Sequence, residues 1–275
     1  MTAPSISQLE AEARRIRCLV LETIHHAGMG HTGGSLSETD ILTALYFRVM
    51  QRIDPGDPGR ADRDRFVLSK GHATPGYYAT LAARGYFSPE MLATFDQLGT
   101  PLQCHPDMRK AAGVDMSTGS LGQGLSCGIG MALAAQRDRL PFRTFVLIGD
   151  GESQEGQIWE AVLYGGARRV KGIVAIVDNN GVQLASSTDE AVPLGDVASK
   201  WRAFGWNVLD VDGHDMAGLV AALECARELA GRGPVAVIAR TIKGKGVSFM
   251  EGRFEWHGKA PNDEEFRRAM AEIER

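Results

Sequence analysis

The chain has 275 residues, of which 44% are hydrophobic and 23% are charged, values typical of a soluble globular protein. Its formal net charge of −4 gives no reason to expect a nucleic acid or an anionic membrane as partner, and no stretch approaches the roughly 20 apolar residues of a membrane-spanning helix. The four cysteines are scattered, without the Cys-x-x-Cys pairs of zinc or redox sites, which favours free thiols in a cytoplasmic protein.

The spacing of apolar residues predicts helices and strands that alternate along the chain. Apolar residues recur every three or four positions over 9–24, which predicts an amphipathic helix, and 41–50 is expected to form a second one. Short, almost wholly apolar runs follow, and such runs predict strands that are covered on both faces of a sheet. These strands are expected at 65–69, 144–148, 173–178 and 235–240, with a further candidate at 206–211. The intervening and final helices are expected at 128–135, 158–168, 217–230 and 263–275.

Strands that alternate with helices predict an α/β fold, in which a central parallel sheet carries helices on both faces. No internal repeat, low-complexity tract or flexible linker interrupts this pattern. We therefore expect residues 1–275 to form a single domain.

Two turns that are rich in glycine or asparagine follow consecutive predicted strands. Asp150 lies between two glycines directly after the strand at 144–148, and Asn180 follows the strand at 173–178. If the two strands are neighbours, both residues lie at the edge of the sheet where ligands of α/β proteins bind. Their oxygens suit Mg²⁺, and the helix expected after Gly156 would direct its free N–H groups at an anion. Either sequence alone could be an ordinary turn, but together they predict a site that holds a divalent metal against a diphosphate.

A second glycine-rich segment, Gly-Gln-Gly-Leu-Ser-Cys-Gly at 122–128, imitates a dinucleotide-binding fingerprint. That fingerprint closes a strand and opens a helix, whereas 116–120 is polar and turn-like. We interpret the segment as a loop that leads into the small-residue helix at 128–135, which packs closely on the sheet.

Four of the seven histidines lie in turn-forming sequences beside glycine or proline. Loop histidines in such sequences are placed to face a cleft, and imidazoles can donate and accept protons near neutral pH. A cluster of them suits proton transfer around a hydroxylated substrate. The four are His31, His72, His105 and His257, whereas His25, His26 and His214 are expected to be structural.

These histidines and turns belong to a series of short motifs that run along the chain. The motifs are Gly-His-Thr-Gly-Gly at 30–34, Asp-Arg-Phe-Val-Leu-Ser-Lys-Gly-His at 64–72, His-Pro at 105–106, Ser-Thr-Gly-Ser-Leu-Gly-Gln-Gly at 117–124, Gly-Asp-Gly-Glu at 149–152, Asp-Asn-Asn-Gly at 178–181, Asp-Gly-His-Asp at 212–215, Lys-Gly-Lys-Gly at 243–246 and His-Gly at 257–258. By these motifs, which cover nearly the whole chain in order, the sequence resembles the N-terminal half of transketolases. It resembles most specifically the separate N-terminal subunit of split transketolases.

The resemblance implies a thiamine diphosphate-binding fold with Mg²⁺, for which Ca²⁺ or Mn²⁺ could substitute. It implies that the metal is held by Asp150, by the side chain of Asn180 and by the backbone carbonyl of Val182. The implied cofactor contacts are His72, Gly119, Ser120, Leu121, Gly151, Glu152, Asn180 and His257. The histidines implied to bind or protonate the hydroxyls of the donor sugar are His31, His105 and His257.

Thiamine catalysis also needs a glutamate that bonds the aminopyrimidine of the cofactor. In the family this glutamate, like most residues that hold the sugar phosphate, lies in the second half of the enzyme. The resemblance therefore implies half of an active site, which works only with a separate pyrimidine-binding C-terminal subunit, in an α2β2 assembly. Together the two subunits would transfer a two-carbon ketol unit from a ketose phosphate to an aldose, in the pentose phosphate route or in specialised catabolism.

Three other interpretations stay open. The cofactor-binding subunit of a 2-oxoacid dehydrogenase also carries Gly-Asp-Gly and Asn-Asn, but this would not explain His31, His72 and His105, which suit polyhydroxylated substrates. Deoxyxylulose-phosphate synthase shares more of the pattern but is normally one long chain. A non-catalytic module that kept the fold should have lost some metal ligands or histidines, and this chain has lost none.

Overall fold

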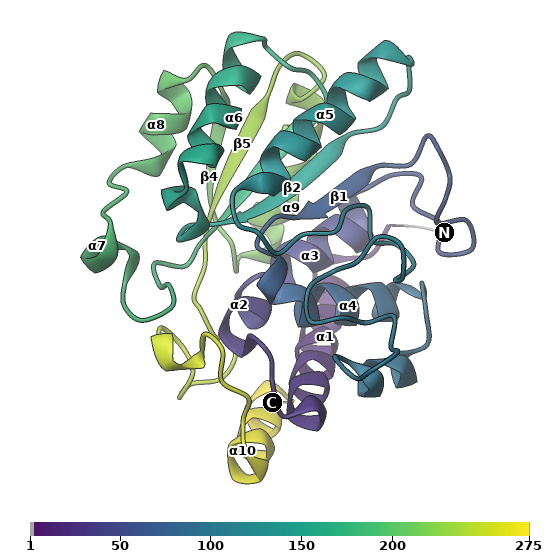
Figure 1. Ribbon diagram of the computed structural model, residues 1–275, viewed down its shortest axis with the longest axis vertical. Helices are drawn as coiled ribbons and strands as arrows, with labels where there is room; N and C mark the ends of the chain where they lie inside the picture. Colours follow the sequence, from purple (N-terminus) through teal and green to yellow (C-terminus); the bar gives the residue numbers. More distant parts are fainter. Residues whose placement is uncertain (1–2, 275) are drawn as a thin grey trace.

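The computed structural model describes residues 3–274 and places a five-stranded parallel sheet at their centre (Figure 1). The strands are β1 (Arg65–Leu68), β2 (Thr144–Gly149), β3 (Ile173–Asn179), β4 (Asn207–Asp212) and β5 (Val235–Arg240). Their order across the sheet is β1-β2-β3-β5-β4, and every neighbouring pair is parallel. The predicted α/β class and all five expected strands are confirmed.

Both faces of the sheet are apolar because successive side chains of a strand point to opposite faces. In β2, Phe145 and Leu147 pack into a core formed with helices on one side, whereas Val146 and Ile148 pack into a separate core on the other. The first side carries α1 (Ile6–Ala27), α3 (Thr39–Ala44), α4 (Thr74–Arg84) and α9 (Met216–Leu229). The second side carries α5 (Gln123–Arg137), α6 (Gly156–Ala167) and α8 (Val197–Ala203), which lie together in Figure 1. Burial on both faces explains why the strands are continuous apolar runs.

The remaining elements complete the fold. They are α2 (Thr32–Ser37), α7 (Thr188–Ala191), α10 (Asp263–Ile273), a π-helical turn (Leu45–Val49) and four 3₁₀ turns (Gly71–Ala73, Pro89–Thr94, Glu152–Gln154 and Phe254–Trp256). The last helix, α10, packs beside α1 at the end of the molecule remote from α5 and α6 (Figure 1). The four cysteines are free thiols, as expected. Among the helices in residues 3–274, none has the length and apolar character needed to cross a membrane.

Two helices differ from the sequence prediction. The helix expected at 41–50 is α3, which ends at Ala44 and gives way to the π-helical turn, where the Met50 N–H donates to the Leu45 carbonyl, five residues back, at 2.8 Å. This wider turn places Tyr46 in the core, where its hydroxyl donates to that of Tyr77 at 3.2 Å.

The helix expected from residue 128 begins earlier, at Gln123. The residue before it, Gly122, has a left-handed φ of 84° and no side chain that could cap the first turn, so the side-chain signal of a helix start is missing. The segment at 122–128 therefore opens a helix, but in the described chain no strand precedes it at 116–120, so it is not a dinucleotide fingerprint. The expected close packing is confirmed, because a Cβ on Gly128 would lie 2.4 Å from Cγ2 of Val146 in the sheet.

Gly166 near the end of α6 allows the closest approach of two backbones in this layer. A Cβ at this position would lie 1.7 Å from the Phe204 carbonyl oxygen, which is backbone and cannot rotate away. We expect Gly166→Ala to lower the free energy of unfolding by about 1–3 kcal/mol, the usual cost of overpacking. The matched control is Gly130→Ala in α5, where a Cβ would meet no atom within 4 Å. It should raise stability by about 0.5–1 kcal/mol. Urea unfolding of both variants provides the measurement, and equal effects would contradict this account of the packing.

Candidate active site

The ends of β2 and β3 open into a pocket of about 240 Å³. Gly149 of β2 pairs with Asp178 of β3, so the turns that follow the two strands lie side by side, as predicted. Asp150, Asn180 and Val182 all line this pocket. The three residues expected to hold a metal are therefore brought together from two neighbouring strand ends.

Asp150 is a buried carboxylate, only 2% exposed, and directly follows the end of β2. Its oxygens accept hydrogen bonds from the backbone N–H groups of Gly151 (2.7 Å) and Gly181. Burial, and secondarily the nearby charge of Asp178, raises the pKa of Asp150 to about 6. Within residues 3–274 it forms no ion pair with a side chain. A buried acid in this environment would be stabilised by a cation placed against it.

The neighbouring donors are neutral oxygens. Asn180 Oδ1 accepts from the Val182 N–H at 3.1 Å, while its Nδ2 donates to Asp178 at 3.3 Å. The Val182 carbonyl faces the pocket, since the ammonium of Lys243 donates to it at 3.1 Å. No cluster of three or more His, Cys, Asp or Glu side chains in the described part of the chain could hold a metal. The set of one carboxylate, one amide and one carbonyl fits a hard ion such as Mg²⁺ that completes its shell with phosphate oxygens.

Lys243 brings a buried positive charge to the same pocket, a role that the sequence alone does not predict. The side chain is 3% exposed, and its Nζ lies 2.8 Å from Nδ1 of His257. Burial, with a contribution from Lys70, lowers the pKa of Lys243 to about 8. Lys245 in the same Lys-Gly-Lys-Gly motif instead lies 3.7 Å from Glu251 and is partly exposed. Only the fold shows which lysine of the motif enters the pocket.

Three of the four loop histidines form a cluster at the rim of the pocket. The ring centroids are 5.1 Å apart for His31 and His72, 5.3 Å for His31 and His257, and 5.1 Å for His72 and His257. Burial lowers the pKa of all three, that of His257 to about 3, and the charge of Lys243 lowers them further. Near neutral pH these rings are therefore uncharged, so each can both donate and accept a hydrogen bond.

The fourth histidine, His105, lies beside the loop at 119–121. A Cβ on Gly119, whose φ is +146°, would be 2.8 Å from Cδ2 of His105, so this contact requires glycine. His105 is exposed, yet it lies close enough to His31 to contribute to the lowered pKa of that ring. Leu121 and Gly151 are among the pocket-lining residues, whereas Gly119 and Ser120 lie outside the lining.

Glu152, an implied cofactor contact, ties together three segments around the pocket. Its buried carboxylate accepts from Ser69 Oγ (2.6 Å) and from the backbone N–H groups of Gly122 (2.8 Å) and Gly149 (3.1 Å). The side chain also lines the pocket. It fixes the end of β1, the start of α5 and the end of β2 relative to one another.

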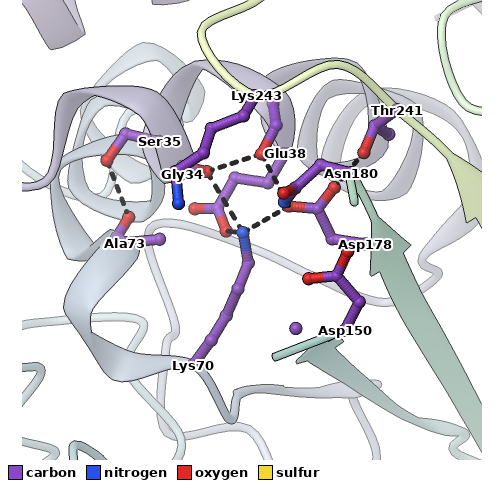
Figure 2. Close-up of polar contacts among 12 residues, drawn as sticks. Gly34, Ser35, Glu38, Lys70, Ala73, Asp150, Asp178, Asn180, Thr241 and Lys243 are labelled. Atoms are coloured by element: carbon purple, nitrogen blue, oxygen red, sulfur yellow. Dashed lines mark hydrogen bonds and ion pairs between the residues drawn. The ribbon is translucent and has the colours of Figure 1, made fainter. Parts of the chain in front are cut away.

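A buried charged cluster adjoins the pocket, which one of its members, Lys70, also lines (Figure 2). Lys70 Nζ is 2.6 Å from Asp178 Oδ2 and 2.9 Å from Glu38 Oε2, and all three side chains are at most 2% exposed. Burial opposes the charge of Lys70, but the two carboxyl groups hold its pKa above the usual value. Burial raises the pKa of Glu38 to about 8, whereas Lys70 keeps that of Asp178 below its usual range. Asp178 also accepts from the hydroxyls of Ser37 (2.6 Å) and Thr241.

The sequence alone predicts no role for this cluster. Lys70 and Asp178 lie in the sequence motifs, each at the end of an apolar strand. A charged residue in that position could have signalled a buried ion pair, because the strand that leads to it is covered on both faces. Glu38 offered no such signal, since it lies between two short helices.

Comparison with known proteins identifies the family. Residues 9–273 match the family model described as the thiamine diphosphate binding domain of transketolase. The chain is 49% identical over 267 residues to the 6-deoxy-6-sulfo-D-fructose transketolase subunit SqwG of a Clostridium species, which covers 97% of this chain and 96% of that protein. It is 40% identical to an apulose-4-phosphate transketolase subunit of Phocaeicola vulgatus, over 98% and 94% of the two chains. This chain belongs to the transketolase family.

Single-chain transketolases extend well beyond the matched region. Human transketolase is 35% identical over 92% of this chain, which spans 40% of the human protein. The crystal structure of transketolase from Campylobacter jejuni matches with a TM-score of 0.91 at 29% identity, over 98% of this chain and 43% of that one. These matches confirm the predicted fold, the transferase family and the correspondence to the N-terminal subunit of a split transketolase. Family membership favours this assignment over a 2-oxoacid dehydrogenase or a deoxyxylulose-phosphate synthase.

Proposed function

We propose that this transketolase subunit binds the diphosphate end of thiamine diphosphate through Mg²⁺. Asp150, Asn180 and Val182 would ligate the metal with a carboxylate, an amide and a carbonyl oxygen. The observation that carries this proposal is the convergence of these three donors on one pocket wall beside a buried ammonium group. The divalent cation would supply the positive charge that balances the buried carboxylate of Asp150, and the diphosphate would complete its ligand shell.

The backbone and Lys243 would hold the diphosphate itself. Gly151 lines the pocket directly after Asp150, so its position places peptide groups next to the metal without an intervening side chain. Lys243 Nζ is 3.1 Å from the Val182 carbonyl, next to the proposed metal ligands, and would pair with a phosphate oxygen. Thiamine diphosphate, once bound, supplies the carbon nucleophile that breaks and remakes the carbon–carbon bond of the sugar.

His31 and His257, two of the uncharged histidines, would bind the hydroxyl groups of the donor sugar together with His105. His31, His72 and His257 stand about 5 Å apart by ring centroid, and the Nδ1 atom of His31 is buried without a hydrogen-bond partner in residues 3–274. A sugar hydroxyl would satisfy such an atom, whose isolation is otherwise costly. A neutral imidazole can also take the hydroxyl proton of the ketose as its carbon–carbon bond breaks, and return one to the product. We propose His31, His105 and His257 for this proton transfer and His72 for contact with the cofactor.

We further propose that a separate C-terminal subunit completes the site, with two copies of each chain in the assembly. Two relatives that match this chain over nearly their whole length are named as transketolase subunits. They are named for different sugars, 6-deoxy-6-sulfo-D-fructose and apulose-4-phosphate, each of which carries an anionic group. We propose that the donor here is likewise a ketose with a phosphate or sulfonate group, from which two carbons pass to an aldose.

Reconstitution tests this function. The purified chain should transfer no ketol unit by itself, and mixing it with the C-terminal transketolase subunit should give turnover that requires both thiamine diphosphate and Mg²⁺. The donors to compare are 6-deoxy-6-sulfo-D-fructose, apulose-4-phosphate and fructose 6-phosphate, and the control is the C-terminal subunit without this chain. Robust turnover by this chain without a partner would contradict the divided site. Sedimentation of the active mixture measures the stoichiometry.

A further inference from the structure

His214 lies outside the pocket, and the proposed function gives it no role. It follows β4 in the Asp-Gly-His-Asp motif, and its side chain is only 10% exposed. Nε2 of the ring accepts a hydrogen bond from the Ile242 N–H at 2.8 Å, and Nδ1 lies 2.7 Å from Oδ2 of Asp40. Because Nε2 must be the acceptor, the proton of the neutral ring is on Nδ1 and is donated to Asp40.

Asp40 is itself held by a second partner. Its Oδ2 lies 2.7 Å from a guanidinium nitrogen of Arg17 in α1, and the two side chains are 9% and 8% exposed. Burial alone would raise the pKa of Asp40, but Arg17 and the hydrogen bond from His214 hold it below the usual value. The ring of His214 is therefore anchored by an ionised carboxylate that two helices fix in place.

The other end of the His214 ring contacts the segment at 241–244, which leads from β5 into the pocket. Thr241 bonds the buried Asp178, and the Gly244 N–H donates to the Gly33 carbonyl at 3.0 Å. Ile242 between them is 36% exposed, so packing restrains its side chain little. Its N–H bond to His214 orients the Thr241–Ile242 peptide, one residue before Lys243, while the Ile242 carbonyl accepts from the Lys245 N–H at 3.2 Å.

We propose that His214 is a positioning residue for the cofactor site, acting through the Ile242 peptide to direct Lys243 at the diphosphate. The inference rests on the proposed role of Lys243. An imidazole suits the task because it bridges a backbone donor and a carboxylate in one rigid ring. Supporting interactions of this kind typically change ligand affinity about 10- to 100-fold when they are removed.

Two substitutions distinguish the roles of the two ring nitrogens of His214. In His214→Asn the amide reaches only the position of Nδ1, so it keeps the bond to Asp40 and loses the bond to Ile242. In His214→Gln the carbonyl oxygen reaches the position of Nε2 and can still accept from Ile242. In the assembled enzyme at saturating Mg²⁺, calorimetry should show about 10-fold weaker binding of thiamine diphosphate for His214→Asn. Binding by His214→Gln should stay within about threefold of the wild type, and reversed behaviour of the two variants would overturn the proposal.

A double-mutant cycle with Lys243→Met distinguishes positioning from a general structural role. Lys243→Met should weaken thiamine diphosphate binding, and adding His214→Asn to it should then have less than about a twofold further effect. An equal loss in both backgrounds would overturn the positioning role and leave the function of Lys243 intact. Unchanged binding by Lys243→Met alone would overturn both the proposed diphosphate contact and the inference that depends on it.

A second variant keeps the test decisive if His214→Asn does not fold. Asp40→Asn preserves the shape of the anchor while removing its charge. It should weaken binding of thiamine diphosphate severalfold in the wild-type background and not in the Lys243→Met background. A loss of the same size in both backgrounds would overturn the proposal.

Discussion

Asp150→Asn should weaken the Mg²⁺-dependent binding of thiamine diphosphate to the assembled enzyme by at least about 100-fold. The proposed metal site contains one carboxylate, and the remaining protein donors are neutral, so this substitution removes its only negative charge. The amide keeps the size of the side chain and an oxygen that can accept from Gly151 or Gly181. Asp150→Ala should abolish this binding altogether. Calorimetric titration with thiamine diphosphate at fixed Mg²⁺ measures both effects.

The unfolding temperature of the cofactor-free protein is the control that Asp150→Asn does not act by destabilising the fold. Burial and Asp178 raise the pKa of Asp150, which shows that the carboxylate is unfavourable without a cation. The cofactor-free variant should therefore unfold at the same temperature as the wild type or a higher one. Asp189→Ala, which removes an exposed carboxylate in α7, should change neither stability nor affinity. Unchanged affinity in Asp150→Asn would contradict the metal assignment.

Lys70→Met should lower the free energy of unfolding by about 3–5 kcal/mol, the usual cost of removing one partner of a buried ion pair. Asp178 would lose its cation at 2.6 Å while remaining fully buried, and Glu38 would lose its only close positive charge in the described structure. The thioether has a similar length, so packing changes little. Urea unfolding of the purified chain measures the loss. A variant as stable as the wild type would show that the cluster contributes no stability.

Glu38→Gln is the matched control, because it alters the same cluster without removing the cation. The pKa of Glu38 is raised from 4.5 to about 8, so the folded protein keeps a proton between these values that the unfolded chain releases. The stability that Glu38 contributes is therefore present in full below pH 4.5 and falls as the pH rises towards 8. Below pH 4.5 the variant should lie within about 1 kcal/mol of the wild type, and at higher pH it should become the more stable of the two because its stability lacks this decline.

The strands and the pair of turns could be predicted because their signals are local. A continuous apolar run predicts a strand covered on both faces, and in a parallel sheet the carboxyl ends of such strands meet at one edge. These two rules place Asp150 and Asn180 at the same edge of the sheet, and the pairing of β2 with β3 then brings them together. The start of α5 could not be predicted because Gly122 begins it in a left-handed conformation. The turn after Ala44 could not be predicted because its π-helical geometry leaves the apolar pattern of a helix largely intact.

The meeting of Glu38, Lys70 and Asp178 could not be predicted, because which charged side chains come together depends on distant parts of the chain. Glu38 and Lys70 are 32 residues apart in sequence, and Asp178 lies 108 residues beyond Lys70. Nothing near any of them indicates that the others will surround it. Lys243 illustrates the same limit, since the neighbouring Lys245 has nearly identical local sequence and lies outside the pocket lining.

The carboxylate of Asp178 has a consequence for how the site responds to its ligand. It receives bonds from α2 through Ser37, from the end of β1 through Lys70 and from the segment after β5 through Thr241. Three walls of the pocket are thus joined at one anion before any cofactor arrives. Binding then needs little ordering of the backbone, so little of the free energy gained from contacts is lost to conformational entropy. The proposed diphosphate end of the site is therefore a preorganised receptor, in which three segments of the chain already hold one another in place.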